Sequence, residues 1–350
     1  MVYQLKLVVY LLYMSQPTQQ ERPIILIDGF NNFIRHFLVN QEINLRSQPV
    51  GGVVGFLKSV DYLVGSFCPS RVYVIWENGG PSPRRKHISP QYKANRAKMK
   101  EVKKIQQGKE SIRDVLALDD ETRIQQITML TALLKSTPVC QVYVQDTECD
   151  DVIAYLAQDK FRNSTAKKII VSNDKDFYQL LHDPLINIYD PATRKIIDGD
   201  EVINKFGISA RNFCLAKTIA GDDSDNVDGV PGAGFKTVAK RFPKMASAEE
   251  DLDIASIITE AKAANIGKKK PIAVYDDIVE CEQLIRRNWD LMYLNSSNLS
   301  ASQISKINYI VDTHEPKMDK LGLIKTIIEC GINATFDYDR FCSQMRNFVR

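Results

Sequence analysis

Acidic side chains gather in two groups within a short stretch of the chain, each after an apolar run that predicts a β-strand. The five residues are Glu148, Asp150, Asp151, Asp174 and Asp176. The apolar runs are residues 139–144 and 168–171. In open α/β sheets, ligands lie beyond the carboxyl ends of the strands. Carboxylates gathered there repel one another, and oxygen ligands of this kind favour hard divalent ions such as Mg²⁺ or Mn²⁺.

Two earlier strands repeat the arrangement. Residues 23–27 form an apolar run that ends at Asp28, and residues 71–76 form another that ends at Glu77. For one acidic cluster alone, a set of helix N-caps and surface residues is the stronger alternative. Four successive strands that each end in a carboxylate favour a metal site.

Helical segments are expected between and after these strands. We predict helices over residues 31–39, 53–67, 121–135 and 200–219, and a further strand over 186–189. Strands that alternate with helices indicate an α/β fold with a mainly parallel central sheet and helices on both faces.

Composition excludes few functions but restricts the setting. The 350 residues are 44% hydrophobic and 25% charged, which is ordinary for a globular protein, and the net charge of +3 identifies no partner. The seven cysteines are scattered without a CxxC pair, so reduced thiols are expected rather than a disulfide framework or a zinc site.

Residues 2–13 are apolar but too short to span a bilayer. We expect residues 1–22 to be a disordered N-terminal extension.

A long insertion follows Glu77, and its charge is strongly one-sided. Residues 78–90 are rich in glycine and proline and predict a loop. Residues 84–109 contain ten Lys or Arg and a single acid, a net charge of +9. A solvated helix face would pair its cations with acids four residues away, and those acids are missing. A polyanionic partner explains the segment better.

A glycine-rich turn occupies residues 229–234, with the sequence GVPGAG, and opens a helix that carries Lys236 and Lys240. Backbone N–H groups at such a turn can hold a phosphate. A purely structural helix–turn–helix would use the same residues, but two lysines four positions apart favour binding to a nucleic-acid backbone.

Five motifs together resemble the 5′-nuclease superfamily, which includes flap endonucleases, the 5′→3′ exonuclease domains of bacterial DNA polymerases and phage 5′ nucleases of the ribonuclease H type. The motifs are ILIDG (25–29), PRRKHISPQYKANR (83–96), ECDD (148–151), SNDKDF (172–177) and GDDSDNVDGVPGAG (221–234). The resemblance covers roughly residues 23–245. It implies a PIN-like catalytic core over 23–200 with a helical arch inserted at 78–135. It also implies a helix–hairpin–helix and a helical C-terminal region over 201–350.

The resemblance implies roles for individual residues. The implied metal-binding acids are Asp28, Glu77, Glu148, Asp150, Asp151, Asp174, Asp176, Asp222 and Asp225. The family usually has Asp where this chain has Glu77, and Asp223 is an additional acid within its motif. The implied catalytic cations at the scissile phosphate are Lys93, Arg84 and Arg85. The implied nucleic-acid contacts are Tyr92, Arg96, Gly229, Val230, Gly232, Gly234, Lys236 and Lys240.

The implied activity is metal-dependent 5′→3′ exonuclease and flap endonuclease cleavage of DNA, or of RNA primers on DNA, with primer removal during replication as its role. Two Mg²⁺ ions per site are expected, with Mn²⁺ as a substitute and K⁺ at the hairpin turn. The acid groups Glu148/Asp150/Asp151 and Asp174/Asp176 are expected to serve different metals. Expected partners are flapped or nicked DNA, RNA–DNA hybrids, and a single-strand binding protein or sliding clamp, for a monomer in the cytoplasm without membrane association.

Two alternatives share much of this evidence. A PIN-type ribonuclease would have the same acidic sheet edge, but such domains generally lack the helix–hairpin–helix and the basic arch. A catalytically inactive flap-binding module would require the loss of key acids, and this chain retains nearly all of them.

Overall fold

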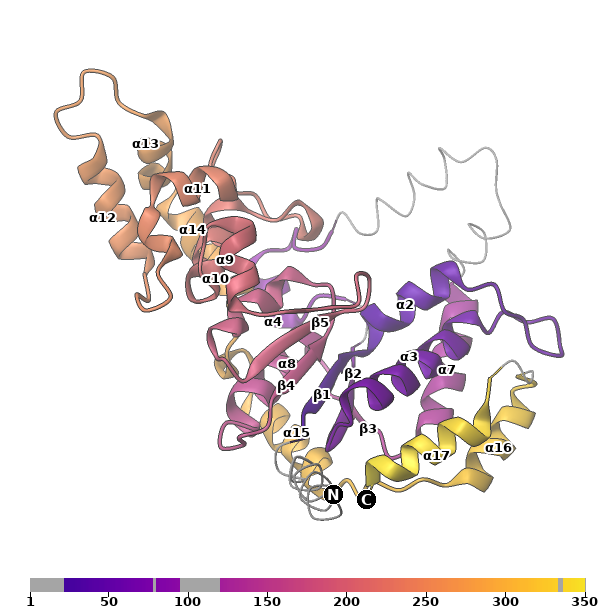
Figure 1. Cartoon of the computed structure of the whole chain (residues 1–350). Coiled ribbons are helices and arrows are strands. Elements are labelled where there is room, and N and C mark those ends of the chain that lie inside the picture. Colours follow the sequence, from indigo (N-terminus) through magenta and orange to yellow (C-terminus); the bar gives the residue numbers. More distant parts are fainter. Residues whose placement is uncertain (1–21, 78–79, 95–119, 333–335, 350) are drawn as a thin grey trace, which may run out of the picture.

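The computed structural model describes residues 22–77, 80–94, 120–332 and 336–349. Figure 1 shows a central sheet between two layers of helices, with a group of further helices projecting beyond one end. The predictions for residues 1–21, for Arg96 and for the other residues of 95–119 lie outside the described residues. Arg22, at the end of the predicted extension, belongs to the fold, because its guanidinium donates to the carbonyls of Cys68 and Pro69 at 2.8 Å each.

The sheet has six strands in the order β3-β2-β1-β4-β5-β6. Their bounds are β1 Ile24–Asp28, β2 Arg71–Trp76, β3 Cys140–Tyr143, β4 Lys168–Val171, β5 Ile186–Asp190 and β6 Lys195–Ile197. The first five strands are parallel and β6 is antiparallel. The prediction of a mainly parallel α/β sheet is confirmed. The strand β6 was not predicted, because its sequence KII contains only two apolar residues and none of the three residues is buried.

Alternate residues of β1 face opposite layers. Ile25 and Ile27 belong to one buried cluster, and Ile24 and Leu26 belong to the other. A strand with both faces buried shows a continuous apolar sequence, which is why IILI was recognisable as a central strand. Its central position places Asp28, the last strand residue, in the middle of the sheet edge.

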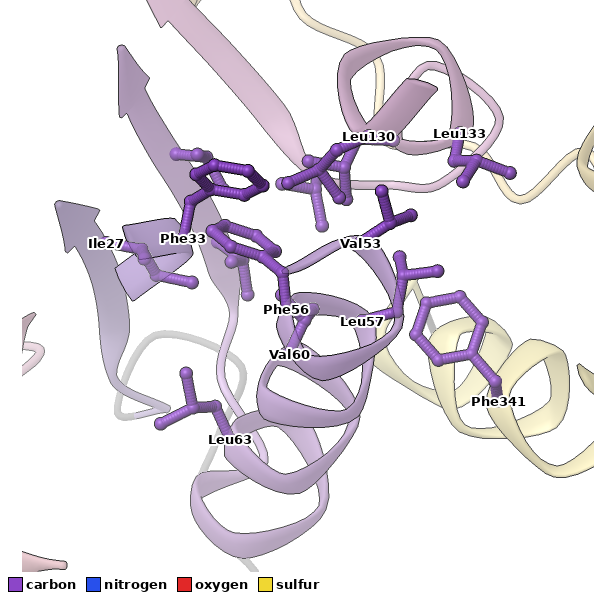
Figure 2. Packing of buried hydrophobic residues seen from close by; sticks show 14 of the residues in the cluster. Ile27, Phe33, Val53, Phe56, Leu57, Val60, Leu63, Leu130, Leu133 and Phe341 are labelled. Atoms are coloured by element: carbon purple, nitrogen blue, oxygen red, sulfur yellow. The ribbon is translucent and has the colours of Figure 1, made fainter. Parts of the chain in front are cut away.

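One face of the sheet is covered by helices from both ends of the chain. They are α2 Gly29–Val39, α3 Gly51–Phe67, α7 Asp120–Leu134, α16 Lys320–Glu329 and α17 Tyr338–Val349. Figure 2 shows Phe56 and Val60 of α3 packed among Phe33, Leu130 and other apolar residues of this layer. Because α2 begins directly after Asp28, this packing holds the first turn of α2 against the sheet edge.

The opposite face carries α8, a 3₁₀ helix and α15. Their bounds are α8 Cys149–Tyr155, continued by a π-helical turn Leu156–Lys160, the 3₁₀ helix η2 Lys175–His182, η5 Ser296–Asn298 and α15 Ala301–Thr313. Both predicted acid groups lie at the N-terminal ends of elements in this layer, since Glu148 precedes α8 and Asp174 precedes η2.

The remaining helices form a third apolar cluster beyond the sheet. They are α9 Gly199–Phe206, α10 Ala210–Ala220, η3 Asp223–Asp225, α11 Phe235–Arg241, η4 Pro243–Ala246, α12 Ile254–Ala264, α13 Ala273–Glu280 and α14 Glu282–Met292. The chain then returns to the sheet, where α15 packs on one face and α16 and α17 on the other. The predicted boundary near residue 200 stays a prediction.

Two local expectations are wrong. Residues 78–90 are not all loop, because Pro83–Ile88 forms the helix α4, capped by the Ser82 side chain, which accepts from the Arg85 N–H. The predicted helix over 200–219 is two helices, broken at Gly207, whose φ of 67° lies in the left-handed region that ends helices. Apolar residues recur with helical spacing on both sides of Gly207. The hydrophobic pattern therefore does not reveal where the first helix ends.

Other sequence expectations concern cysteines and membranes. All seven cysteines are free thiols, as predicted. None of the helices in the described part of the chain combines the length and apolar character that crossing a membrane requires.

Candidate active site

Asp28 lies at the centre of the acidic sheet edge and is also the N-cap of α2. Its Oδ1 accepts from the backbone N–H of Asn31 at 3.0 Å, and its Oδ2 accepts from the hydroxyl of Ser172 at 3.3 Å. Only 6% of the residue is exposed. Burial, followed by the charges of Glu77 and Asp174, raises the pKa of this carboxyl to about 7, although the hydrogen bonds lower it.

Three further carboxylates share this environment. Burial raises the pKa of Asp150 well above its ordinary value, and the charges of Asp174, Asp28 and Glu77 raise it further. Glu77 accepts a hydrogen bond from the Cys149 N–H at 3.0 Å, which directs its side chain toward the start of α8. Parallel strands end at the same edge of the sheet. The fold therefore brings together carboxylates that are spread over about 150 residues of the sequence, from Asp28 to Asp174.

Asp174 is the fourth member and caps the N-terminus of η2. Its Oδ1 accepts from the Asp176 N–H at 2.9 Å. Burial raises the pKa of Asp174; Lys217 lowers it, while Asp225 and Asp222 raise it. We call Asp28, Glu77, Asp150 and Asp174 the crowded carboxylates, because their mutual repulsion is the common feature of this group.

Other acids at the same edge are matched by cations. Glu148 is fully buried, and its two oxygens contact Arg85 at 3.1 Å and Lys93 at 2.5 Å. The N–H of Ser82 also donates to it at 2.9 Å. Burial alone would raise the pKa of Glu148, but Arg85 and Lys93 hold it at about 2.

Arg85 also binds Asp151 through a two-point contact. Its NH1 and NH2 groups lie 2.5 Å and 2.9 Å from the two carboxylate oxygens, and its Nε donates to the carbonyl of Leu291 at 2.8 Å. Arg85 is 2% exposed. The sequence analysis expected this guanidinium at a scissile phosphate, whereas here it is enclosed and occupied by two carboxylates and a carbonyl.

A third cation was missed by the sequence analysis. Lys217, on α10, contacts Asp176 and lies 2.6 Å from Oδ2 of Asp222, and only 5% of it is exposed. The Lys217 charge helps to hold the pKa of Asp222 below its usual range, against the effect of burial. The available signal was a single lysine inside the otherwise apolar stretch FCLAKTIA. We call Glu148, Asp151, Asp176 and Asp222 the paired carboxylates.

Lys93 is the predicted catalytic cation that lies nearest to both groups. Its backbone is left-handed, with φ of 58°, and its N–H donates to the Asp225 carbonyl at 2.8 Å. Its Nζ lies 3.9 Å from Oδ2 of Asp225 as well as against Glu148. Burial would lower the pKa of Lys93, but Glu148, Asp150 and Asp225 raise it above its ordinary value, so the side chain is a cation.

Tyr92 is directed inward. Its hydroxyl donates to Asp225 Oδ2 at 3.2 Å, and the residue is 5% exposed. The implied contact of Tyr92 with nucleic acid stays a prediction, and in this conformation the ring is buried. Arg84 is partly exposed and donates to the carbonyl of Asp290 at 2.8 Å.

The predicted hairpin turn joins α10 to α11. The N–H of Val230 donates to the Ile219 carbonyl at 2.8 Å. Gly229 packs so closely on Ala220 that a Cβ would lie 2.2 Å from its carbonyl oxygen, and Gly232 has a φ of 70°. Gly234 begins α11, on which Lys236 and Lys240 are exposed. The turn therefore brings exposed backbone and two lysines to one end of the third cluster.

Whether the crowded carboxylates suit a metal can be judged from their chemistry. All their donor atoms are oxygens, and burial with like-charge repulsion favours any cation that enters. Within the described ranges, however, no three His, Cys, Asp or Glu side chains already stand in a ligating arrangement. The donor set therefore fits a hard divalent ion by charge and atom type.

The acidic edge of the parallel sheet therefore lies beside Lys93 and near the glycine hairpin. Residues 23–207, just over half of the chain, match the family "5′-3′ exonuclease, N-terminal resolvase-like domain". The chain belongs to this family. It is a structure-specific 5′ nuclease with 5′–3′ exonuclease and flap endonuclease activity on DNA.

Relatives agree with this assignment. The chain is 28% identical over 222 residues to a 5′-3′ exonuclease of Buchnera aphidicola, covering 63% of this chain and 70% of that protein. A 5′-3′ exonuclease of Aquifex aeolicus is 27% identical over 66% of this chain and 72% of its own length. The solved structure of T5 5′-exonuclease with zinc has a TM-score of 0.64 at 19% identity, covering 84% of this chain and all of that one. It shows the same fold.

Proposed function

We propose that this 5′ nuclease depends on divalent metal ions and removes 5′ flaps and RNA primers from DNA during replication. The observation that carries the proposal is the group of crowded carboxylates, because burial and like-charge repulsion raise the pKa values of Asp28, Asp150 and Asp174 despite the nearby lysines. The T5 5′-exonuclease structures are described with bound divalent metal ions, which supports the same cofactor class for this chain.

The residues that would hold the ions are Asp28, Glu77, Asp150 and Asp174, with Mg²⁺ as the proposed ion and Mn²⁺ as a substitute. When bound, two divalent ions supply an activated water and relieve charge on the leaving oxygen. The paired carboxylates already have cations, so we propose that they position the ligands rather than bind metal directly. Glu148, for example, holds Lys93 at the edge of the site.

Lys93 is the residue we propose to contact the scissile phosphate. Its ammonium is held by Glu148 with Asp225 close by, and its left-handed backbone is tied to the Asp225 carbonyl. A charge held in position before the substrate arrives stabilises the developing negative charge without a reorganisation cost. Cys149, which lies beside Glu148, is not suited to attack the phosphate as a nucleophile. Burial raises the pKa of its thiol well above the ordinary value and so disfavours the reactive thiolate.

The hairpin is proposed to bind the duplex backbone. Lys236 and Lys240 are exposed on α11, and a Cβ added at Gly232 or Gly234 would meet open space. We propose that the hairpin turn binds K⁺, as the resemblance to the 5′-nuclease superfamily implies. We also propose that the protein is a monomer in the cytoplasm. A single-strand binding protein or sliding clamp is the proposed recruiting partner. Reduced thiols throughout the chain support the location.

The test is cleavage mapping on matched 5′-flap, nicked and RNA-primed DNA, with Mg²⁺, with Mn²⁺ and with EDTA. We expect cuts near the base of the flap in either metal and none in EDTA, and Asp174→Ala serves as the inactive control. Binding to flap DNA without cleavage in both metals would instead identify an inactive flap-binding module. Cleavage of unpaired RNA alone would identify a PIN-type ribonuclease.

A further inference from the structure

The segment from Asn288 to Asn298 joins the hairpin to the acidic edge. It comprises the end of α14 and the turn through η5, and it lies outside the family match at 23–207. We call this segment the brace. Among its hydrogen bonds are three connections to parts of the site that the family match or the motifs had identified.

At the hairpin end, Asn288 is completely buried and its amide is a double donor. The Nδ2 group donates to the carbonyl of Thr218 at 2.9 Å and to the carbonyl of Asp228 at 2.8 Å. Thr218 is on α10 beside Lys217, and Asp228 immediately precedes the glycine turn. One side chain therefore connects both sides of the hairpin to the start of the brace.

At the acid end, Gln179 connects the brace to η2. Its Nε2 donates to the carbonyl of Asp176 at 2.8 Å and to that of Met292 at 3.1 Å. Its Oε1 accepts from the N–H of Leu294 at 3.0 Å. Because Asp174 is the N-cap of η2, the middle of the brace is connected to the element that follows a crowded carboxylate.

A third connection involves the paired carboxylates. The Leu291 carbonyl accepts from Arg85 at 2.8 Å, and Nδ2 of Asn298 donates to Oδ1 of Asp151 at 2.8 Å. The Arg85–Asp151 pair is thus held from two points of the brace. Asp151 neighbours Asp150 in the first turn of α8, so this contact also orients a second element of the acidic edge.

We propose that the brace is a positioning element that sets the distance between the duplex-gripping hairpin and the cleavage centre, and thereby the position of the cut. The inference rests on the proposed function of the hairpin and the acids. None of the brace residues is proposed to touch the reacting phosphate. Buried amide–carbonyl hydrogen bonds at both ends resist sliding, because each broken one leaves a polar group without a partner. When the hairpin binds a duplex, the cleavage centre is then held at a fixed distance from the hairpin. One particular phosphate of the DNA therefore reaches the cleavage centre.

Two variants and one control test the connection to the hairpin and the connection to Asp151 separately. Asn288→Ala removes both donors at the hairpin end, and Asn298→Ala removes the contact with Asp151. Gln283→Ala changes an exposed residue on the same helix, α14, and serves as the control. Asn298 is only partly buried, so its variant is expected to fold even if Asn288→Ala does not. Thermal unfolding of each variant measures that directly.

The first readout is the distribution of cut positions on a 5′-flap substrate. We expect Asn288→Ala to spread cleavage over neighbouring phosphates and to raise KM more than it lowers kcat. We expect Asn298→Ala to keep a single cut position and lower kcat about tenfold, as changes to the partners of metal-site residues do. A single, unshifted cut in Asn288→Ala with an unchanged KM would overturn the proposal.

The second readout does not require cleavage and separates this proposal from the proposed function. Amide hydrogen exchange in the metal-free protein reports opening of the hairpin at 227–234 and of the acid turn at 174–180. We expect Asn288→Ala to speed exchange at both places, on the order of tenfold for the loss of a buried hydrogen bond. Faster exchange at the hairpin alone would overturn the proposal even if the wild-type protein cuts flaps, and faster exchange at both places would support it even if it does not.

Discussion

Eight of the nine acids of the site fall into two groups with different electrostatics, although members of the two groups are interspersed along the chain. The crowded carboxylates have raised pKa values where a shift is resolved, because burial and mutual repulsion oppose ionisation. Among the paired carboxylates, Glu148 and Asp222 have lowered pKa values because Arg85, Lys93 and Lys217 lie against them. Residues adjacent in sequence, Asp150 and Asp151, fall in different groups.

The difference shows that an acid at the sheet edge need not be a metal ligand. A paired carboxylate gains little from a divalent ion, since a protein cation already occupies its oxygens. A crowded carboxylate gains a great deal, since the ion relieves both burial and repulsion. The expectation that Glu148, Asp150 and Asp151 serve one metal stays a prediction, and the charge distribution divides these three residues differently. The following predictions test the division, from the largest effect to the smallest.

The largest effect is expected at Asp174. We expect Asp174→Asn to lower flap cleavage by more than about 100-fold, because changes that only touch the partners of ligands already cost 10–100-fold. The same variant should unfold at a higher temperature than the wild type in EDTA, because it removes repulsion. The matched change Asp176→Asn should lower the unfolding temperature in EDTA, since it takes a carboxylate from Lys217. Shifts in the same direction would contradict the division.

A smaller but clear effect is expected at the paired group. Arg85→Met leaves Glu148 and Asp151 buried without their guanidinium, so we expect a loss of about 3–5 kcal/mol in the free energy of unfolding. Urea denaturation measures this loss. Lys86→Met, on the exposed face of α4, is the control and should change stability little. A loss below 1 kcal/mol in Arg85→Met would mean that the pair is not a structural element.

The smallest effect is a pH dependence with a defined sign. The folded pKa of Asp28 is raised from 3.8 to about 7, so between these values the folded protein binds more protons than the unfolded chain. Stability from this group is present at low pH and is lost as the pH rises through 7, by about 2 kcal/mol between pH 5.5 and 8.5 in EDTA. Asp28→Asn should remove that slope.

The paired group provides the opposite sign as a control. The folded pKa of Glu148 is lowered from 4.5 to about 2, so its contribution to stability is present above pH 4.5 and is lost as the pH falls through 2. The measured quantity is the difference in the free energy of unfolding between the wild type and each variant in EDTA. For Glu148→Gln this difference should rise with pH below pH 4.5. For Asp28→Asn it should fall with pH above pH 5.5. Slopes of equal sign would show that the two acids share one environment.

Much of the sheet could be predicted from the sequence because most of its strands coincide with short apolar runs of neighbouring residues. Residues 71–76 and 168–171 were predicted with their observed bounds, since each is one basic residue followed by an apolar run, with a polar residue directly after it. The break at Gly207 and the helix α4 escaped because their signals are single residues, a left-handed glycine and a capping Ser82, within longer segments of other character.

The sequence by itself determined that carboxylates lie where parallel strands end, because a strand and the residue after it are neighbours along the chain. Only the tertiary structure decided which of these carboxylates lie directly against Arg85 or Lys217. Arg85 meets Asp151 across 66 residues, and Lys217 meets Asp176 across 41. Such pairs depend on how the insertion and α10 pack against the sheet, and no periodicity or spacing in the chain reports that packing.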